Sequence, residues 1–90
     1  MFNLSDYMFM PRLFEYNGNI FFFFSNEGSP LEPCHIHIRK PEKRMKIFLD
    51  PSIRIAYIYG YNTKEVKRLL NFIIINENEI RRKWHAYFNQ

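Results

Sequence analysis

The chain has 90 residues, of which 47% are hydrophobic and 19% aromatic, and its formal net charge is +4 at pH 7. This length supports one domain with a single modest core, and the hydrophobic composition excludes an intrinsically disordered chain. The sequence shows neither a signal-peptide pattern nor a stretch approaching the roughly 20 apolar residues of a membrane span. A single cysteine, Cys34, allows no internal disulfide. We therefore expect a cytoplasmic protein without a membrane partner.

The first two thirds of the sequence predict β-strands joined by short turns. Residues 1–9 have the character of an N-terminal extension or arm, and residues 10–90 that of a single α+β domain. Asn17-Gly18 between two β-prone runs is a strong hairpin signal, because both positions accept positive φ angles. The expected strands cover residues 12–15, 20–24, 34–39, 44–49 and 53–59, with a loop over 25–33 that contains Gly and Pro.

After Gly60 the hydrophobic period changes from 2 to 3.6, which predicts helix. Asn62 or Thr63 is the expected N-cap, and Glu65 in the first turn favours the helix dipole. An apolar stripe continues to the end of the chain; its members are Val66, Leu70, Ile73, Ile80, Trp84 and Phe88. Polar residues around Asn76 interrupt the stripe and predict two helices, or one helix kinked there. The expected fold is an antiparallel sheet of about five strands with this helical tail packed on one face.

The segment Cys34-His35-Ile36-His37-Ile38 is the most informative part of the sequence. In a strand, alternate residues point to opposite faces, so Cys34 and the isoleucines face the core while His35 and His37 face away from it. Two imidazoles side by side can serve as the acid and base of RNA cleavage, because histidine titrates near neutral pH. Alternatively, both imidazoles bind loop carbonyls or are buried at an interface.

The same two histidines form half of a possible metal site. Imidazoles two residues apart on a strand can bind one ion with bonds of about 2.0–2.1 Å, and the third ligand would be Glu27, Glu32 or His85. Neighbouring cations disfavour a divalent ion at this position. We therefore expect no metal and no cofactor, with His35 and His37 as the ligands if a metal does bind.

Basic residues cluster around the predicted turn that follows the histidine strand. The candidate nucleic-acid-binding residues are Arg39, Lys43, Arg44 and Lys46. A cationic face that also carries Phe48 suits a phosphate backbone with stacked bases. The alternative is a solvated hairpin whose lysines prevent edge-to-edge aggregation.

Four consecutive phenylalanines, Phe21 to Phe24, place aromatic rings on both faces of a strand. A single helical layer covers only one face of a sheet, so the other face needs a second cover. We expect the N-terminal arm, a loop or a partner protein there, and these four residues are the candidate partner interface. Trp84, Tyr87 and Phe88 are spaced to anchor the last helix on the sheet.

Several motifs occur in a recognisable order: Phe21-Phe22-Phe23-Phe24-Ser25-Asn26-Glu27-Gly28, Glu32-Pro33-Cys34-His35-Ile36-His37-Ile38, Leu49-Asp50-Pro51, Gly60-Tyr61-Asn62 and Trp84-His85-Ala86-Tyr87-Phe88. Over about residues 10–88 the chain resembles a family of small bacterial proteins catalogued as domain of unknown function 4160. That family usually has Pro where this chain has Cys34, and many members have a loop His near the position of Glu27. Both departures weaken a metal site built from three histidines.

The resemblance implies no settled activity. Genes of the family often lie beside a second small gene, which implies toxin–antitoxin pairs. We therefore expect a small intracellular interaction module, one component of such a two-gene pair, whose partner is a second copy or a small cognate protein. The alternatives are a ribonuclease or RNA-binding protein using the basic His35/His37 face, and a metal-binding protein.

Overall fold

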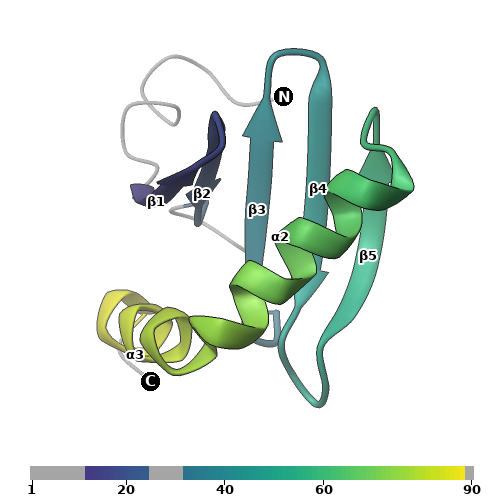
Figure 1. Ribbon diagram of the computed structural model, residues 1–90. Coiled ribbons are helices and arrows are strands. Elements are labelled where there is room, and N and C mark those ends of the chain that lie inside the picture. Colours follow the sequence, from purple (N-terminus) through teal and green to yellow (C-terminus); the bar gives the residue numbers. More distant parts are fainter. Residues whose placement is uncertain (1–11, 25–31, 89–90) are drawn as a thin grey trace.

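The computed structural model describes residues 12–24 and 32–88. Figure 1 shows the predicted α+β fold, a five-stranded antiparallel sheet followed by two helices. The strands lie side by side in chain order, and the elements are β1 (Arg12–Tyr16), β2 (Asn19–Phe22), β3 (His35–Lys40), β4 (Lys43–Phe48), β5 (Arg54–Tyr59), α2 (Thr63–Ile75) and α3 (Glu77–Phe88). The expected arm at residues 1–9 and most of the expected loop over 25–33 lie outside the described residues.

Local sequence signals explain where these elements turn. Asn17 and Gly18 have φ angles of 51° and 78°, as the predicted two-residue hairpin requires. Asn62 caps α2 through a capping box: its side chain accepts from the Glu65 N–H, and the Glu65 carboxylate accepts from the Asn62 N–H. The strand boundaries differ from the predicted ones by only one or two residues.

The helical part is divided at Asn76, as expected. Its side-chain Nδ2 donates to the Phe72 carbonyl at 2.8 Å, and its backbone N–H reaches the same carbonyl at 3.0 Å. The backbone carbonyl of Asn76 in turn accepts from the Ile80 N–H. One asparagine thus ends α2 and starts α3. Neither helix that the structure describes is long and apolar enough to cross a membrane.

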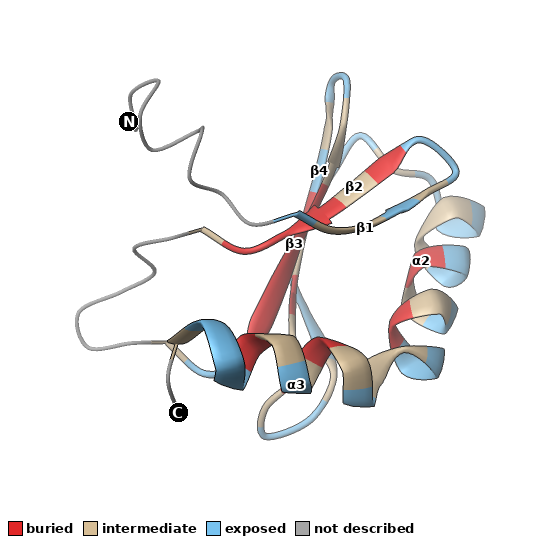
Figure 2. Cartoon of the chain, turned by 90° about the vertical axis from the view of Figure 1, so that its left-hand side faces the viewer, coloured by how far each residue is buried: buried red, intermediate tan, exposed pale blue. Residues whose placement is uncertain are grey.

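The hydrophobic core lies between the helices and the middle strands of the sheet (Figure 2). Its buried members are Phe21, Phe23, Cys34, Ile36, Ile38, Met45, Ile47, Leu49, Leu69, Ile73, Ile80 and Trp84. Each large apolar side chain contributes about 1.5–3 kcal/mol when fully buried. The helical stripe is shifted by one residue at one turn, because Leu69 is fully buried where Leu70 was expected, and Leu70 lies at the margin of the core.

A single arginine ties α3 to the segment between β4 and β5. The guanidinium of Arg81 donates to Asp50 Oδ1 at 2.5 Å, to the Leu49 carbonyl at 2.9 Å and to Glu77 Oε2 at 2.8 Å. The hydrogen bonds to Asp50 and Glu77 raise the pKa of Arg81. This arrangement uses the planar fork of the guanidinium, which a lysine cannot reproduce.

Gly60, between β5 and α2, should be more sensitive to substitution than Gly18. Both have positive φ angles, 85° and 78°, but a Cβ on Gly60 would lie 2.7 Å from the Glu42 carbonyl oxygen, whereas a Cβ on Gly18 meets no atom within 4 Å. We expect Gly60→Ala to lower the free energy of unfolding by about 2–3 kcal/mol and Gly18→Ala by about 1 kcal/mol. Urea unfolding of the two variants measures this difference, and equal losses would show that the close approach at Gly60 relaxes freely.

Candidate functional site

The sheet has an outer face, which is the face opposite α2. On β4, Met45 and Ile47 are buried in the core, so Arg44, Lys46 and Phe48 between and after them belong to the outer face. Antiparallel pairing then fixes which residues of the neighbouring strands share that face, because directly opposite residues point the same way.

Residues of β4 and β5 form three cross-strand pairs on the outer face, and each pair joins a cation to an aromatic ring. Arg44 is opposite Tyr59, Lys46 is opposite Tyr57, and Phe48 is opposite Arg54. We call these six residues the cation–aromatic ladder. Cross-strand neighbours on one face lie about 4.5–5.5 Å apart between Cβ atoms, so the ladder is a continuous surface.

Several contacts determine the electrostatic character of this ladder. The Arg54 guanidinium lies 4.4 Å from the centroid of the Phe48 ring, and Lys46 Nζ lies 4.8 Å from it. Lys46 also forms an ion pair with Glu32 at 2.8 Å. On the next strand Arg39 lies directly opposite Arg44, so a second guanidinium adjoins the ladder on the outer face. The ladder itself contains three cations and no acidic residue, and one of these cations, Lys46, is paired with Glu32.

The outermost part of the ladder is accessible. All six residues of β5 are exposed, and Tyr59 retains 68% of its surface. Sequence reasoning treated residues 53–59 as an ordinary strand and missed Arg54, Tyr57 and Tyr59. Simple alternation places Arg54 and the two tyrosines on opposite faces. They share a face only because the pairing of β5 shifts by one residue opposite Lys46, which the sequence does not reveal.

The two histidines of β3 lie on the outer face, as predicted, but they are buried. The exposed fraction of His35 is 0% and that of His37 is 6%. His35 Nδ1 lies 2.8 Å from the Pro33 carbonyl, which can only accept, so Nδ1 carries the proton and donates. The carbonyl contact fits the alternative in which a histidine binds a loop carbonyl.

Aromatic rings surround both imidazoles. The His35 ring contacts those of Trp84 and Phe48, with centroids 4.9 and 5.5 Å away, and the His37 ring stacks on Phe22 at 5.4 Å. The histidine rings themselves are 5.1 Å apart. Acid–base catalysis needs hydrogen-bond reach to a substrate, so a catalytic role for this pair stays a prediction.

The predicted basic cluster is divided between the two faces. Arg39, Arg44 and Lys46 share the outer face, whereas Lys43 belongs to the helix side and forms an ion pair with Glu65 of α2 at 2.7 Å. The Lys43 hydrogen bond, followed by that from Asn62, lowers the pKa of Glu65. The structure thus brings three of the four predicted nucleic-acid-binding residues together.

The four consecutive phenylalanines lie on both faces, as expected from alternation. Phe21 and Phe23 belong to the core, while Phe22 and Phe24 lie beside His37 on the outer face. The first three are buried and Phe24 is half-buried. These rings pack within the protein, and partner binding through them stays a prediction.

The structure bears in part on the metal hypothesis. Among residues 12–24 and 32–88, no three His, Cys, Asp or Glu side chains are grouped as a metal ion would need, and Glu27 lies outside these ranges. His85 is exposed on α3, and Glu32 binds Lys46.

Burial raises the pKa of the Cys34 thiol to about 12, so the thiol stays protonated and unreactive at neutral pH.

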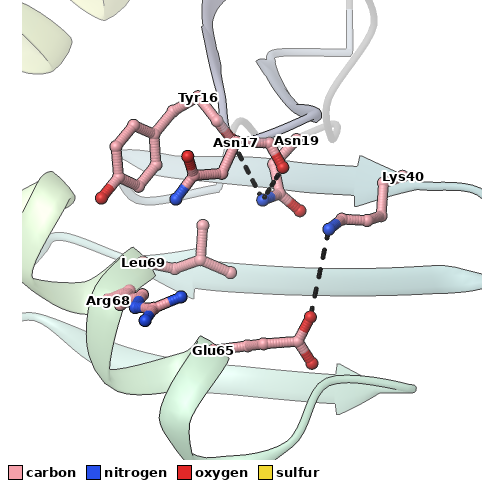
Figure 3. A pocket seen from close by; sticks show the side chains of 7 residues that line it. All are labelled: Tyr16, Asn17, Asn19, Lys40, Glu65, Arg68 and Leu69. Atoms are coloured by element: carbon pink, nitrogen blue, oxygen red, sulfur yellow. Dashed lines mark hydrogen bonds and ion pairs between the residues drawn. The ribbon is translucent and has the colours of Figure 1, made fainter.

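A small pocket lies between the β1–β2 turn and α2, and Glu65 is one of its lining residues (Figure 3). Its volume is about 180 Å³, and its polar lining is largely satisfied within the protein. Asn19 donates to the Tyr16 and Asn17 carbonyls and accepts from the Tyr61 hydroxyl at 2.7 Å. Lys40 faces Glu65 across the opening at 4.0 Å. These contacts make the pocket a junction that holds the hairpin on the helix.

Comparison with known proteins adds a family but no activity. A family model described as a domain of unknown function, DUF4160, matches residues 18–85, from the first turn to α3. The chain belongs to this family. No curated protein and no solved structure matches the chain. The function of this DUF4160 protein therefore has to be argued from its surface.

The burial of His35 predicts a structural contribution that the exposed His85 lacks. His35→Ala removes a buried ring and its hydrogen bond to Pro33, so we expect the free energy of unfolding to fall by about 2–4 kcal/mol. His85→Ala should change it by less than about 0.5 kcal/mol. Thermal or urea unfolding measures both variants, and an unchanged His35→Ala protein would contradict the buried placement.

Proposed function

We propose that this chain is a small interaction module, one component of a two-gene toxin–antitoxin-like pair, and that it binds its partner along the free edge of β5. The observation that supports this proposal is the exposure of the whole strand. Every residue of β5 is exposed although five of its six residues are paired with β4. An exposed strand edge is a template for adding another strand.

The interior of β5 lacks the side chains that commonly protect an edge strand, namely lysine, proline and inward-pointing charges. Ile55 and Ile58 instead retain 39% and 41% of their surface. At the opposite edge of the sheet, β1 exposes Arg12 and Glu15, which are charged. Among the described strands, β5 is therefore the edge suited to association.

The two-gene pair itself rests on the family resemblance. The charge of the chain adds a chemical criterion: a net charge of +4 and the cation–aromatic ladder favour an acidic cognate protein over a basic one. Expression of the chain alone and together with the product of its neighbouring small gene, with growth as the readout, tests this genetic relation.

A charge within the exposed edge strand should prevent strand addition. We expect Ile58→Lys to reduce copurification of the neighbouring gene's product at least tenfold, since the lysine must be desolvated beside an apolar strand. Ile74→Lys on α2 is the matched control, because Ile74 is also an exposed isoleucine but belongs to a helix. Equal copurification by both variants would exclude the β5 edge as the binding surface.

RNA binding is the second candidate function, and the cation–aromatic ladder is the observation that favours it. Exposed aromatic rings stack on unpaired bases while neighbouring arginines and lysines neutralise phosphates. A single strand fits this surface better than a duplex, because only unstacked bases offer their faces to Tyr57 and Tyr59. Cleavage by His35 and His37 would require these buried side chains to become accessible, so binding is the better-supported part of the ribonuclease hypothesis.

Removing one ring of the ladder should weaken RNA binding without altering the fold. We expect Tyr59→Ala to lower affinity for a fluorescent single-stranded RNA about five- to a hundredfold, which corresponds to the roughly 1–3 kcal/mol of one stacked base. Tyr87→Ala is the control, because Tyr87 is an exposed tyrosine on α3. Fluorescence anisotropy at two salt concentrations measures both variants. Binding that is insensitive to Tyr59→Ala and to salt would rule out the ladder.

A further inference from the structure

The β5 edge can also accept a second occupant when the cognate protein is absent. We infer that a second copy of this chain then pairs with the first through antiparallel β5 strands related by a two-fold axis, with Arg54 opposite the partner's Tyr59. This inference rests on the proposed role of the β5 edge and names the occupant of that edge in the purified chain. It would join two five-stranded sheets into one continuous sheet. Figure 1 shows β5 at the margin of the sheet.

The key observation is an irregularity within β5. Lys46 is paired with Tyr57, but the next residue of β4, Ile47, is paired with Ile55, so Ala56 is an extra residue in β5. This is the pattern of a β-bulge. As a result, Ile55 shares the face of Ile47, and Ile58 shares the face of Met45, which is the core side of the sheet.

The bulge determines which symmetric pairings are possible. A two-fold axis perpendicular to a sheet preserves its faces, so residues that oppose each other across the axis must lie on the same face of their own strand. In a regular strand, residues separated by an odd number of positions lie on opposite faces. A regular six-residue strand therefore cannot pair end to end with its own copy.

The extra residue of β5 removes this conflict. With Ala56 inserted, Ile55 and Ile58 lie on one face, although they are three positions apart, and Arg54 and Tyr59 lie together on the outer face. End-to-end pairing then matches faces for Arg54 with Tyr59 and for Ile55 with Ile58, on both sides of the two-fold axis. Symmetric registers centred on Ile55 or on Ile58 also match faces, but each pairs only about half of the strand.

The end-to-end register is also chemically self-complementary. Each Ile55 lies opposite the partner copy's Ile58, which buries two apolar pairs that are exposed in one chain. Each Arg54 lies opposite a tyrosine ring, a favourable cation–π arrangement that occurs twice because of the symmetry. No like charges oppose each other within the paired strands, since Arg54 is the only charged residue of β5.

Charge outside β5 predicts how the association responds to salt. Two chains of net charge +4 approach each other, and Arg44 and Lys46 of both copies lie on the same outer face. Salt screens this repulsion and should strengthen the dimer, whereas it should weaken RNA binding. One added strand edge is small beside the roughly 1,200–2,000 Å² of standard interfaces, so the dimer should be weak and concentration-dependent.

Pairwise disulfide formation tests the register directly. In a Cys34→Ala background, the single variants Ile55→Cys and Ile58→Cys are purified separately and oxidised alone or as a mixture. Facing residues in adjacent strands are close enough for a disulfide after small adjustments. We expect the mixture to form a covalent dimer and neither variant to do so alone, because each Ile55 faces an Ile58.

Each other result counts against the inference. A covalent dimer formed by one variant alone would indicate a different register. Failure of the mixture, together with a monomeric unmodified chain in sedimentation across a concentration and salt series, would exclude a second copy as the occupant. Sedimentation needs no substitution and so remains informative if a cysteine variant misfolds. The proposed cognate-partner role fails separately, if copurification is insensitive to Ile58→Lys.

Discussion

The helices do not bring the last strand of the sheet into the core, and the rest of this structure depends on that limit. The buried core residues of the sheet come from β2, β3, β4 and the segments beside them, and none comes from β5. The last strand is thus held by backbone pairing with β4 and by the turn at Gly60.

The same limit organises the outer face. On β2 and β3, imidazole and phenyl rings pack among themselves, as His37 does with Phe22 and Phe24. On β4 and β5, cations alternate with exposed aromatic rings. The outer face therefore changes from a buried aromatic region to a charged accessible one within a few strands. The histidines belong to the first region and contribute to stability, while the accessible chemistry belongs to the second.

Much of the fold could be predicted because its signals are local. Asn17-Gly18 and Asn62 fix a turn and a helix start through their own backbone preferences, and the alternation around His35 correctly separated the two faces of β3. The burial of His35 was not predictable, because it depends on contact with Trp84, which is distant in sequence. The position of Lys43 depends likewise on the register of β4 beneath Glu65.

β5 is held in the sheet mainly by its main-chain pairing with β4, and its exposed side chains contribute no residue to the buried core. Natural selection on substitutions in β5 therefore acts mainly through the molecules that the strand contacts outside the domain, and much less through the stability of the domain. Such a segment can change its recognition properties rapidly during evolution while the core stays the same. Any specificity that this strand carries therefore depends on six exposed positions that the core does not constrain.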